Sequence, residues 1–559
     1  MGAPDSTTLR FLVIGAGARG NAYAQAVTNA TPGIIHAVAE PHTFKRQEFG
    51  RNYIWGAGTP NEGQEFADWR DWLRWETKRR KQDSTSTLTS TETALGVHGV
   101  FICTLDETHV EILQTLAPLH LHILCEKPLA LSLSDCLTVY RALLDTTPAT
   151  TDINSDTTTN NSESNNNKDK EIQPKTIFSI GHVLRYSPHN ILLRRLLLQD
   201  RVIGDIVSLE HCEPIGWWHF AHSYVRGNWR HETGTGDGSL LTKSCHDLDF
   251  ILWLLSSPLS PPLVPDPSKS TPESNPENDK PHLPHLITST GTLTQFHRAR
   301  KPSLAGAATN CLTCAAAQSC NYNAVAIYAD RHLSQGLHEW PVNIVCPDIE
   351  DILRHNPEAA RSHLLSRLSE DYDVSTTVAK DIAQRPWYGR CVYESDNTVC
   401  DDQIVTLTWS DEGGSKRAKT AVFHMIAPTE KQCERRGRVY GTLGEVEYDS
   451  RSIEIYTFGN GEKRRVDVPR QPVEEKSHGG GDYGLARSFV RAVDAVVNCG
   501  WGVERAQRVH VGCTLEEAVR SHAVVFAAEE ARREEKVIRW KEWWEEKLFE
   551  ALGTGSSCE

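Results

Sequence analysis

Residues Leu9–Gly20, LRFLVIGAGARG, join an apolar run directly to a G-x-G-x-x-G pattern. The apolar run predicts a buried strand, and the following Asn21–Val27 predicts a helix. In such a unit Gly15 permits the tight turn, Gly17 lets the backbone approach a pyrophosphate, and Gly20 lets the helix pack closely on the strand. The phosphates then face unpaired N–H groups at the positive end of the helix. The predicted dinucleotide-binding loop consists of Gly15, Ala16, Gly17, Ala18, Arg19 and Gly20.

An acidic residue follows the second predicted strand. The strand Ile34–Ala39 ends at Glu40, twenty residues after Gly20, where a carboxylate can accept both ribose hydroxyls of the adenosine. Glu40 would repel a 2′-phosphate, so the sequence favours NAD. Three basic residues near this position keep NADP open as the alternative, and they are Arg19, Lys45 and Arg46.

Composition excludes several classes of partner. The 559 residues suffice for two to four domains, and the formal net charge of −14, without a strong basic patch, argues against nucleic acid. No apolar run approaches the roughly 18 residues of a membrane span. Fifteen cysteines, with a polar Met1–Thr8 leading straight into the first strand, predict reduced thiols in the cytoplasm. We therefore expect a cytoplasmic protein without nucleic-acid or membrane partners.

The predicted organisation is an α/β domain followed by an α+β domain. Further apolar strands at Val97–Cys103 and His120–Cys125, separated by a helix at His109–Leu116, give the β-α-β rhythm of a doubly wound parallel sheet. Polar and proline-rich composition predicts disordered insertions. The expected segments are a nucleotide-binding domain at 1–145, an insertion at 146–174, a substrate and oligomerisation domain at 175–528 interrupted by an insertion at 256–285, and a C-terminal surface helix and tail at 529–559.

Alternating apolar residues predict a large, mainly antiparallel open sheet in the second domain. Its expected strands are Thr176–Ile180, Gln403–Trp409, Ala421–Ile426, the hairpin Arg438–Tyr448, and Ile453–Tyr456. Near the end, Thr514–Glu517 forms a capping-box pattern, and the charged, tryptophan-rich Glu529–Lys547 predicts a surface helix. An exposed face of such a sheet would suit a homo-oligomer.

A lysine follows the strand that ends at Cys125, within Glu126-Lys127-Pro128. Ligands bind at the carboxyl edge of a parallel sheet, so Lys127 is expected to point toward the crevice. Pro128 restricts the preceding residue to extended geometry. A lysine here can exchange a proton with a substrate oxygen beside the nicotinamide.

Taken together, these motifs resemble the glucose–fructose oxidoreductase, inositol dehydrogenase and MocA (Gfo/Idh/MocA) family of oxidoreductases. The resemblance covers nearly the whole chain apart from the two insertions and the final helix. It is carried by the glycine-rich turn, Glu40, Thr104–His109, Glu126-Lys127-Pro128, Gly181–Pro188 as a strand of the substrate domain, and His246–Asp249 on a helix.

The resemblance implies roles for particular residues. Lys127 would be the acid/base that assists hydride transfer, with His246 as its partner on the substrate side. Arg185 and Tyr186 would contact substrate. Beyond the glycine-rich loop and Glu40, the residues implied for cofactor binding are Thr104, Leu105, His109, Glu126 and Lys127.

The helix expected to carry His246 begins near Asp237. Leucines fall on one stripe of this helix, and Lys243 and His246 are i, i+3 neighbours on the opposite side, facing either a cleft or solvent. Many family members carry an aspartate four residues before the histidine, where this chain has Thr242. Threonine does not ionise usefully, so His246 alone, or with Lys243, would have to move the proton.

Two further patterns remain open. The aromatic stretch Trp217–Arg230 could stack on a sugar ring or could pack in the core. The spacing Cys311-x2-Cys314-x5-Cys320 offers three thiolates, one fewer than tetrahedral zinc requires, and Cys346 or a histidine could be the fourth. Buried or surface thiols without metal are the alternative.

The expected activity is hydride transfer between a nicotinamide and a hydroxyl-bearing carbon of a sugar, cyclitol or related polyol. Two alternatives stay open: a relative that retains its nucleotide and uses it within a glycoside-cleavage or elimination cycle, and a regulator that only senses nucleotide.

Overall fold

The computed structural model describes residues 7–85, 95–144, 174–233, 238–257, 280–414, 416–472, 475 and 477–552. The expected insertions at 146–174 and 256–285 lie largely outside the described residues, and Asp237 lies outside them too.

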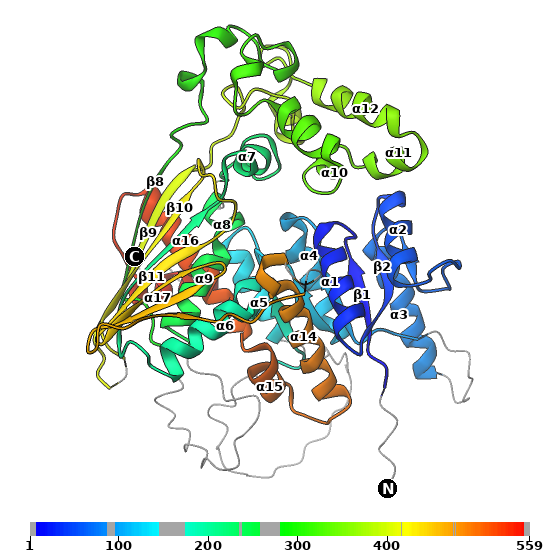
Figure 1. The fold of residues 1–559 in the computed structure, drawn as a ribbon. Helices are drawn as coiled ribbons and strands as arrows, with labels where there is room; N and C mark the ends of the chain where they lie inside the picture. The colour runs from blue at the N-terminus through cyan, green and yellow to red at the C-terminus, as the bar shows by residue number, and fades with distance from the viewer. Residues whose placement is uncertain are drawn as a thin grey trace, which may run out of the picture.

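The first sheet has six strands, all parallel, in the order β3-β2-β1-β4-β5-β6 (Figure 1). This order and direction confirm the predicted doubly wound nucleotide-binding fold. The strand expected at Thr176–Ile180 to open the second domain instead completes this sheet. The strands are β1 (Arg10–Ile14), β2 (Ile34–Ala39), β3 (Glu65–Phe66), β4 (Gly99–Ile102), β5 (His122–Cys125) and β6 (Phe178–Ile180).

Helices from both halves of the chain pack around the first sheet. The helix expected at His109–Leu116 is α4. A helix from the far end of the chain, α14 (Gly481–Val497), packs against α1 and adds its apolar side to the same core. The other helices of this domain are α1 (Ala18–Ala30), α2 (Thr43–Tyr53), α3 (Trp69–Thr85) and α5 (Leu133–Leu144).

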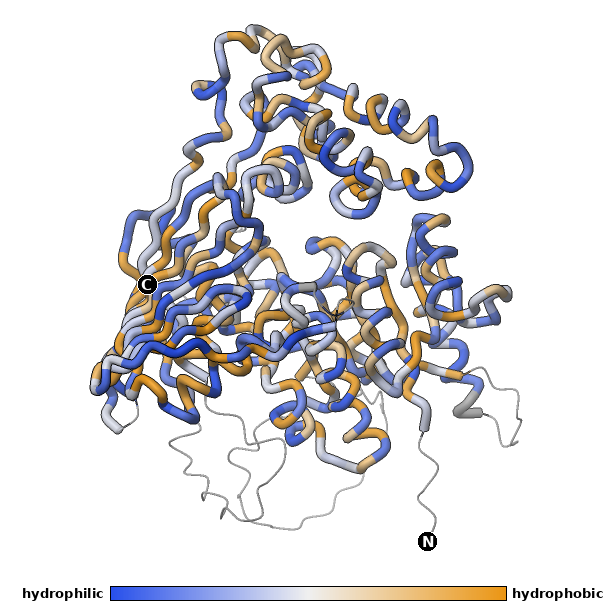
Figure 2. The backbone as a smooth tube through the Cα atoms, viewed as in Figure 1, coloured by the Kyte–Doolittle hydropathy of each residue, from blue (hydrophilic) through white to orange (hydrophobic). Residues whose placement is uncertain are grey.

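The second sheet has nine strands in the order β14-β13-β12-β11-β7-β10-β9-β8-β15. Every neighbouring pair is antiparallel except β7 and β10, which confirms the mainly antiparallel open sheet. Hydropathy alternates along its strands (Figure 2), so one face joins the core and the other carries charges. The strands are β7 (Ile206–Pro214), β8 (Leu286–Thr292), β9 (Asp402–Trp409), β10 (Lys419–Ile426), β11 (Arg436–Gly441), β12 (Gly444–Asp449), β13 (Ile453–Thr457), β14 (Lys463–Val466) and β15 (Ile538–Arg539).

Two buried helices cover the inner face of this sheet, α9 (Cys245–Leu255) and α16 (Leu515–Arg533). Every residue of α9 is buried, because the helix lies between the sheet and α16. The helix therefore has no solvent-facing side, and the expectation that His246 could face solvent is wrong. The chain also breaks before α9, after the short helix α8 (Ser239–Thr242), at Lys243 and Ser244.

Two other expectations need correction. The stretch Gly181–Pro188 is not a strand: it turns through a 3₁₀ segment, Val183–Tyr186, into α6 (Pro188–Arg194). The surface helix expected over 529–547 is interrupted, because α16 ends at Arg533, β15 pairs with β8, and α17 (Trp540–Leu552) follows. The capping box at the start of α16 is present as predicted.

Between β8 and β9, residues 293–401 form a separate lobe that we call the cap, drawn in green at the top of Figure 1. A second hydrophobic core holds the cap together with Trp218. The cap reaches the first domain, since Arg354 pairs with Glu48 at 3.1 Å and its guanidinium lies over the ring of Phe44. Its helices are α10 (Val342–Val345), α11 (Ile349–His355), α12 (Pro357–Ser369) and α13 (Ala379–Ala383).

Among the described helices, none combines the length and apolar character that crossing a bilayer requires.

Candidate active site

The glycine-rich loop lies between β1 and α1 and has the geometry that a pyrophosphate needs. Gly15 has a φ of +94°, and a Cβ there would lie 2.5 Å from the carbonyl oxygen of Cys103. A Cβ on Gly20 would lie 2.0 Å from the carbonyl oxygen of Gly15, whereas a Cβ on Gly17 would meet nothing within 4 Å. No side chain caps the N-terminus of α1 at Gly17. Open space above uncapped N–H groups fits the phosphates of a dinucleotide.

Glu40 is tied to this loop. Its Oε2 accepts a hydrogen bond from the backbone N–H of Ala16 at 2.8 Å, and its Oε1 accepts one from His42 at 2.9 Å. The residue is only 8% exposed. A carboxylate offers about four lone-pair sites, so it keeps acceptors for ribose hydroxyls after these two bonds.

The basic residues that kept NADP open are largely committed elsewhere. Arg19 pairs through Nε with Glu126 and through Nη2 with Asp482, each at 2.8 Å. Arg46 pairs with Glu65 at 2.8 Å and donates to the carbonyl oxygen of Glu40 at 2.6 Å. Arg19 and Glu126 therefore join the loop to the lysine-bearing turn.

The turns after β4 and β5 meet at the carboxyl edge of the sheet. His109 is buried, and its Nδ1 and Nε2 lie 2.8 Å and 3.3 Å from the carbonyl oxygens of Pro128 and Thr104. His109 thus braces the two turns against each other. Leu105 is 51% exposed at the same edge, which leaves an apolar side chain free for a cofactor ring.

Lys127 extends from this edge toward the second domain. Its Nζ donates to the backbone carbonyl of Thr242 at 2.7 Å. Asp106 also faces Lys127, and burial raises the pKa of its carboxyl although the lysine opposes that shift. Trp229 holds Asp106 through a 2.8 Å hydrogen bond from Nε1.

The junction between α8 and α9 carries a buried polar cluster. Arg435 pairs with Glu213 and with Asp247, each at 2.7 Å, and its Nη2 lies 2.6 Å from His246 Nε2. Lys243 pairs with Glu213 at 3.1 Å. We call these five residues the buried cluster. Lys243 and His246, which the sequence predicts to move the proton, both belong to it.

Protonation in the buried cluster follows from burial and pairing. Burial places the pKa of His246 well below its usual value, and the charges of Arg435 and Lys127 act in the same direction while Asp247 opposes them. Burial opposes the charge of Lys243, but Cys433 and Glu213 outweigh it and raise its pKa. Burial also raises the pKa of Glu213 to about 7.

One ring nitrogen of His246 is left over. Nε2 is close to Arg435, whereas the buried Nδ1 has no hydrogen-bond partner among the described residues. A buried polar atom without a partner is costly, which makes this nitrogen a candidate to hydrogen-bond a ligand atom.

The structure uses Arg185 and Tyr186 internally. Arg185 makes a paired interaction with the buried Asp249 at 2.7 and 2.8 Å, and Tyr186 donates to the carbonyl oxygen of Val511 at 2.8 Å. Both are buried. Their polar atoms hold α9 and the chain near 511 together, which leaves little for a substrate.

The aromatic stretch Trp217–Arg230 is largely core. Trp218, Phe220 and Tyr224 are buried, and only Asn228 is exposed. The half-buried His219 lies 3.5 Å from the sulfur of Cys433, next to the buried cluster. The stretch therefore covers the buried cluster, and most of its side chains serve to pack the core.

The three cysteines of the spaced pattern lie around one small cavity, together with Cys391. Cys346 lies elsewhere in the cap, with its sulfur 3.4 Å from Asp348 Oδ1.

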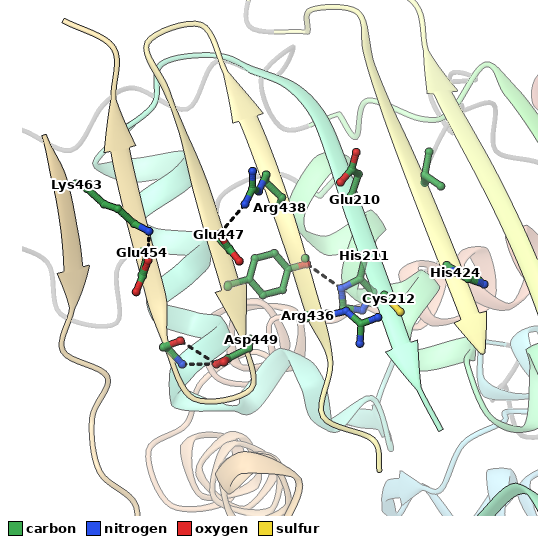
Figure 3. A pocket seen from close by; sticks show the side chains of 14 residues that line it. Glu210, His211, Cys212, His424, Arg436, Arg438, Glu447, Asp449, Glu454 and Lys463 are labelled. Carbon is green, nitrogen blue, oxygen red and sulfur yellow. Dashed lines mark hydrogen bonds and ion pairs between the residues drawn. The ribbon is translucent and has the colours of Figure 1, made fainter. Parts of the chain in front are cut away.

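A larger hollow, about 660 Å³, lies on the charged outer face of the second sheet (Figure 3). Neighbouring strands line it with acidic and basic side chains, among them Glu210, Arg438, Glu447 and Lys463. None of the residues nominated for cofactor or catalysis lines it.

Sequence reasoning missed several parts of the site. Glu213 lies on β7, a strand that the pattern did not reveal, and Arg435 lies just before β11. Asp482 is brought to Arg19 by α14. Glu213 and Arg435 carried no local signal for their roles, because they meet their partners through sheet pairing and helix docking.

Comparisons with known proteins agree with this geometry. Residues 9–147 match the model of the family described as "Oxidoreductase family, NAD-binding Rossmann fold" (GFO_IDH_MocA). Inositol 2-dehydrogenase 2 of Paenarthrobacter aurescens (strain TC1) is 29% identical over 203 residues, 35% of this chain. That match spans 48% of the relative's length.

Solved structures share the fold over nearly the whole chain. An oxidoreductase from Agrobacterium radiobacter in complex with NAD⁺, L-tartaric acid and magnesium has a TM-score of 0.53 at 12% identity, covering 96% of this chain and 100% of that one. Levoglucosan dehydrogenase in complex with NADH has a TM-score of 0.53 at 12% identity, covering 95% and 99%. The family match on residues 9–147, together with the glycine-rich loop and Glu40, identifies the first domain as an NAD-binding Rossmann fold of the Gfo/Idh/MocA oxidoreductase type.

Proposed function

We propose that this protein is an NAD-dependent dehydrogenase that oxidises a hydroxyl-bearing carbon of a sugar, cyclitol or related polyol, or reduces the matching carbonyl. The observation that carries the proposal is the position of Lys127. Its Nζ reaches the α8–α9 junction, 2.7 Å from the carbonyl oxygen of Thr242, and so lies between the cofactor edge of the first domain and the buried cluster of the second.

Lys127, His246 and Lys243 have different roles, which follow from their chemistry. NAD⁺, when bound, supplies the acceptor for the hydride at its nicotinamide C4. Lys127 exchanges the proton of the substrate hydroxyl, which is general acid–base catalysis. His246, held neutral by burial, offers its free Nδ1 to a substrate oxygen. Lys243 is engaged by Glu213 and Cys433, so it sets the charge of the cluster and does not itself move the proton.

The selectivity for NAD over NADP rests on Glu40. Its buried carboxylate at the loop disfavours a 2′-phosphate, and the pairing of Arg19 and Arg46 removes two cations that could have neutralised one. Inositol and levoglucosan dehydrogenases among the similar proteins support a polyol or sugar substrate.

The test is turnover of a sugar and polyol panel by the full-length protein with NAD⁺ and NADP⁺, comparing wild type with Lys127→Met. Lys127→Met should lower kcat by about 10²–10⁴-fold, the usual contribution of a general acid–base, while NADH affinity changes little. Arg438→Met, on the outer sheet face, is the matched control and should retain activity. Full activity in the Lys127 variant would refute the proposed role. Release of free NADH during turnover separates a dehydrogenase from a relative that recycles a retained nucleotide.

A further inference from the structure

We propose that Cys311, Cys314, Cys320 and Cys391 bind a single thiophilic divalent metal ion, Zn²⁺ above all, as a structural centre of the cap. All four are free thiols and line the same small cavity. The cavity, about 20 Å³, has room for one small ion. Four thiolates complete the tetrahedral set that structural zinc requires.

The backbone explains how Cys391 joins cysteines that lie some 80 positions earlier in the chain. Asn310 and Arg390 form an antiparallel bridge. On either side of it, the N–H of Cys311 donates to Gly389 at 2.9 Å, and the N–H of Cys391 donates to Thr309 at 2.8 Å. Side chains alternate between faces in such a pair, so Cys311 and Cys391 lie on the same face.

Short turns supply the other two sulfurs. The C-x2-C spacing spans the 3₁₀ turn Cys311–Thr313, and a second 3₁₀ turn, Ala317–Ser319, leads to Cys320. No three of these sulfurs lie within 4.8 Å of one another in the described structure. Zn–S bonds of about 2.3 Å would bring them to about 3.8 Å, so binding should draw the turns together and stiffen the lobe.

A buried cation marks the cavity as a site for anionic ligands. Arg226 is 1% exposed and lines the cavity, with its Nη2 3.4 Å from the sulfur of Cys311. Its Nε and Nη2 also donate to the carbonyl oxygens of Arg390 and Tyr322, and no ion pair among the described residues gives it a carboxylate. A buried charge needs an opposite charge nearby. Four metal-bound thiolates on a divalent ion carry two net negative charges, which Arg226 would partly neutralise.

The first experiment is metal analysis of the full-length protein purified under reducing conditions and then incubated with one equivalent of ZnCl₂. We expect about one tightly held zinc per chain. Cys320→Ser and Cys391→Ser should each lose most of it. Cys499→Ser, at an exposed cysteine, and Cys346→Ser, at a cap cysteine that does not line the cavity, should keep it. No retained zinc in wild type, or loss on Cys346→Ser with retention in Cys391→Ser, would overturn the proposal.

A second measurement on wild type covers the case in which the cysteine variants do not fold. Titration with a mercurial should release the zinc as four thiols react, and Co²⁺ in its place should show sulfur-to-metal charge-transfer absorption. Iron with acid-labile sulfide, or a disulfide between any two of the four cysteines by mass spectrometry, would contradict a single-ion centre. These readouts do not depend on dehydrogenase activity, so they stand or fall apart from the proposed function.

Discussion

Replacing Gly17 with alanine should impair nucleotide binding by the glycine-rich loop while leaving the folding of the protein nearly unchanged. Gly17 is the N-cap of α1, with φ −75° and ψ −163°, a conformation open to any residue. A Cβ there meets nothing within 4 Å. Alanine loses less backbone entropy on folding, a gain of about 0.4–1 kcal/mol, and is a poorer N-cap than glycine, which offsets part of that gain. We expect the free energy of unfolding to stay within about 1 kcal/mol of wild type.

Nucleotide binding should respond very differently. The space that the methyl group would enter is the space through which a pyrophosphate approaches the uncapped N–H groups of α1. Losing one charge-assisted hydrogen bond costs about 1.5–3 kcal/mol. At about 1.4 kcal/mol per factor of ten, Gly17→Ala should weaken NADH binding by at least about 10-fold.

The assay is fluorescence titration with NADH, following energy transfer from the protein's tryptophans, with chemical unfolding measured on the same samples. Gly459→Ala is the matched control, because it lies in a hairpin turn where a Cβ also meets nothing within 4 Å. It should change neither quantity. NADH affinity within twofold of wild type in a folded Gly17→Ala protein would refute the assignment of this loop to the pyrophosphate.

Two further predictions concern buried charge. Burial lowers the pKa of His182 to about 3 and that of His522 to about 4, against about 6.5 when unfolded, so the unfolded chain binds more protons. The stability that these two neutral histidines contribute is present above pH 6.5 and is lost as the pH falls toward 4. We expect the free energy of unfolding, measured in urea, to fall by a few kcal/mol across this window. Unchanged stability would contradict this prediction. Arg435→Met leaves two buried carboxylates without their guanidinium and should destabilise by about 3–5 kcal/mol in the same assay. Arg438→Met, which breaks a partly exposed pair, should cost no more than about 1 kcal/mol, and equal losses in the two variants would refute this reasoning.

The parts of the fold that the sequence predicts are those whose signal is local. A strand, a glycine turn and a helix are adjacent in the chain, so the first domain could be identified from Gly15, Gly17 and Gly20 in their strand-to-helix context. Glu40 and Lys127 follow strands directly, so their places at the sheet edge could be predicted too. The hairpin at 438–448 was likewise visible, because alternation and a tight turn are short-range features.

The parts that the sequence did not predict depend on contacts between distant segments. The helix α9 is buried all round, so its polar residues follow no amphipathic period and could not be divided between core and cleft. Its Asp247 meets Arg435 only because α9 packs on the second sheet, where Asp247 contacts His211 of β7 and β7 pairs with β11. In the same way, Cys391 reaches Cys311 only through one isolated bridge.

The segment 217–230 contacts the first domain, the second domain and the cap. Trp229 holds Asp106 beside Lys127, His219 lies against Cys433 in the second domain, and Arg226 contacts Cys311 in the cap. Segment 217–230 must stay rigid, because the pKa shifts in the buried cluster persist only while water is excluded from it. If the cap binds a metal, that ion holds Arg226 in place and so stiffens the end of segment 217–230 that reaches the cap. Loss of the metal should therefore reach the chemistry indirectly, by admitting water and raising the pKa of His246 toward its ordinary value, and not by removing a group that touches the substrate.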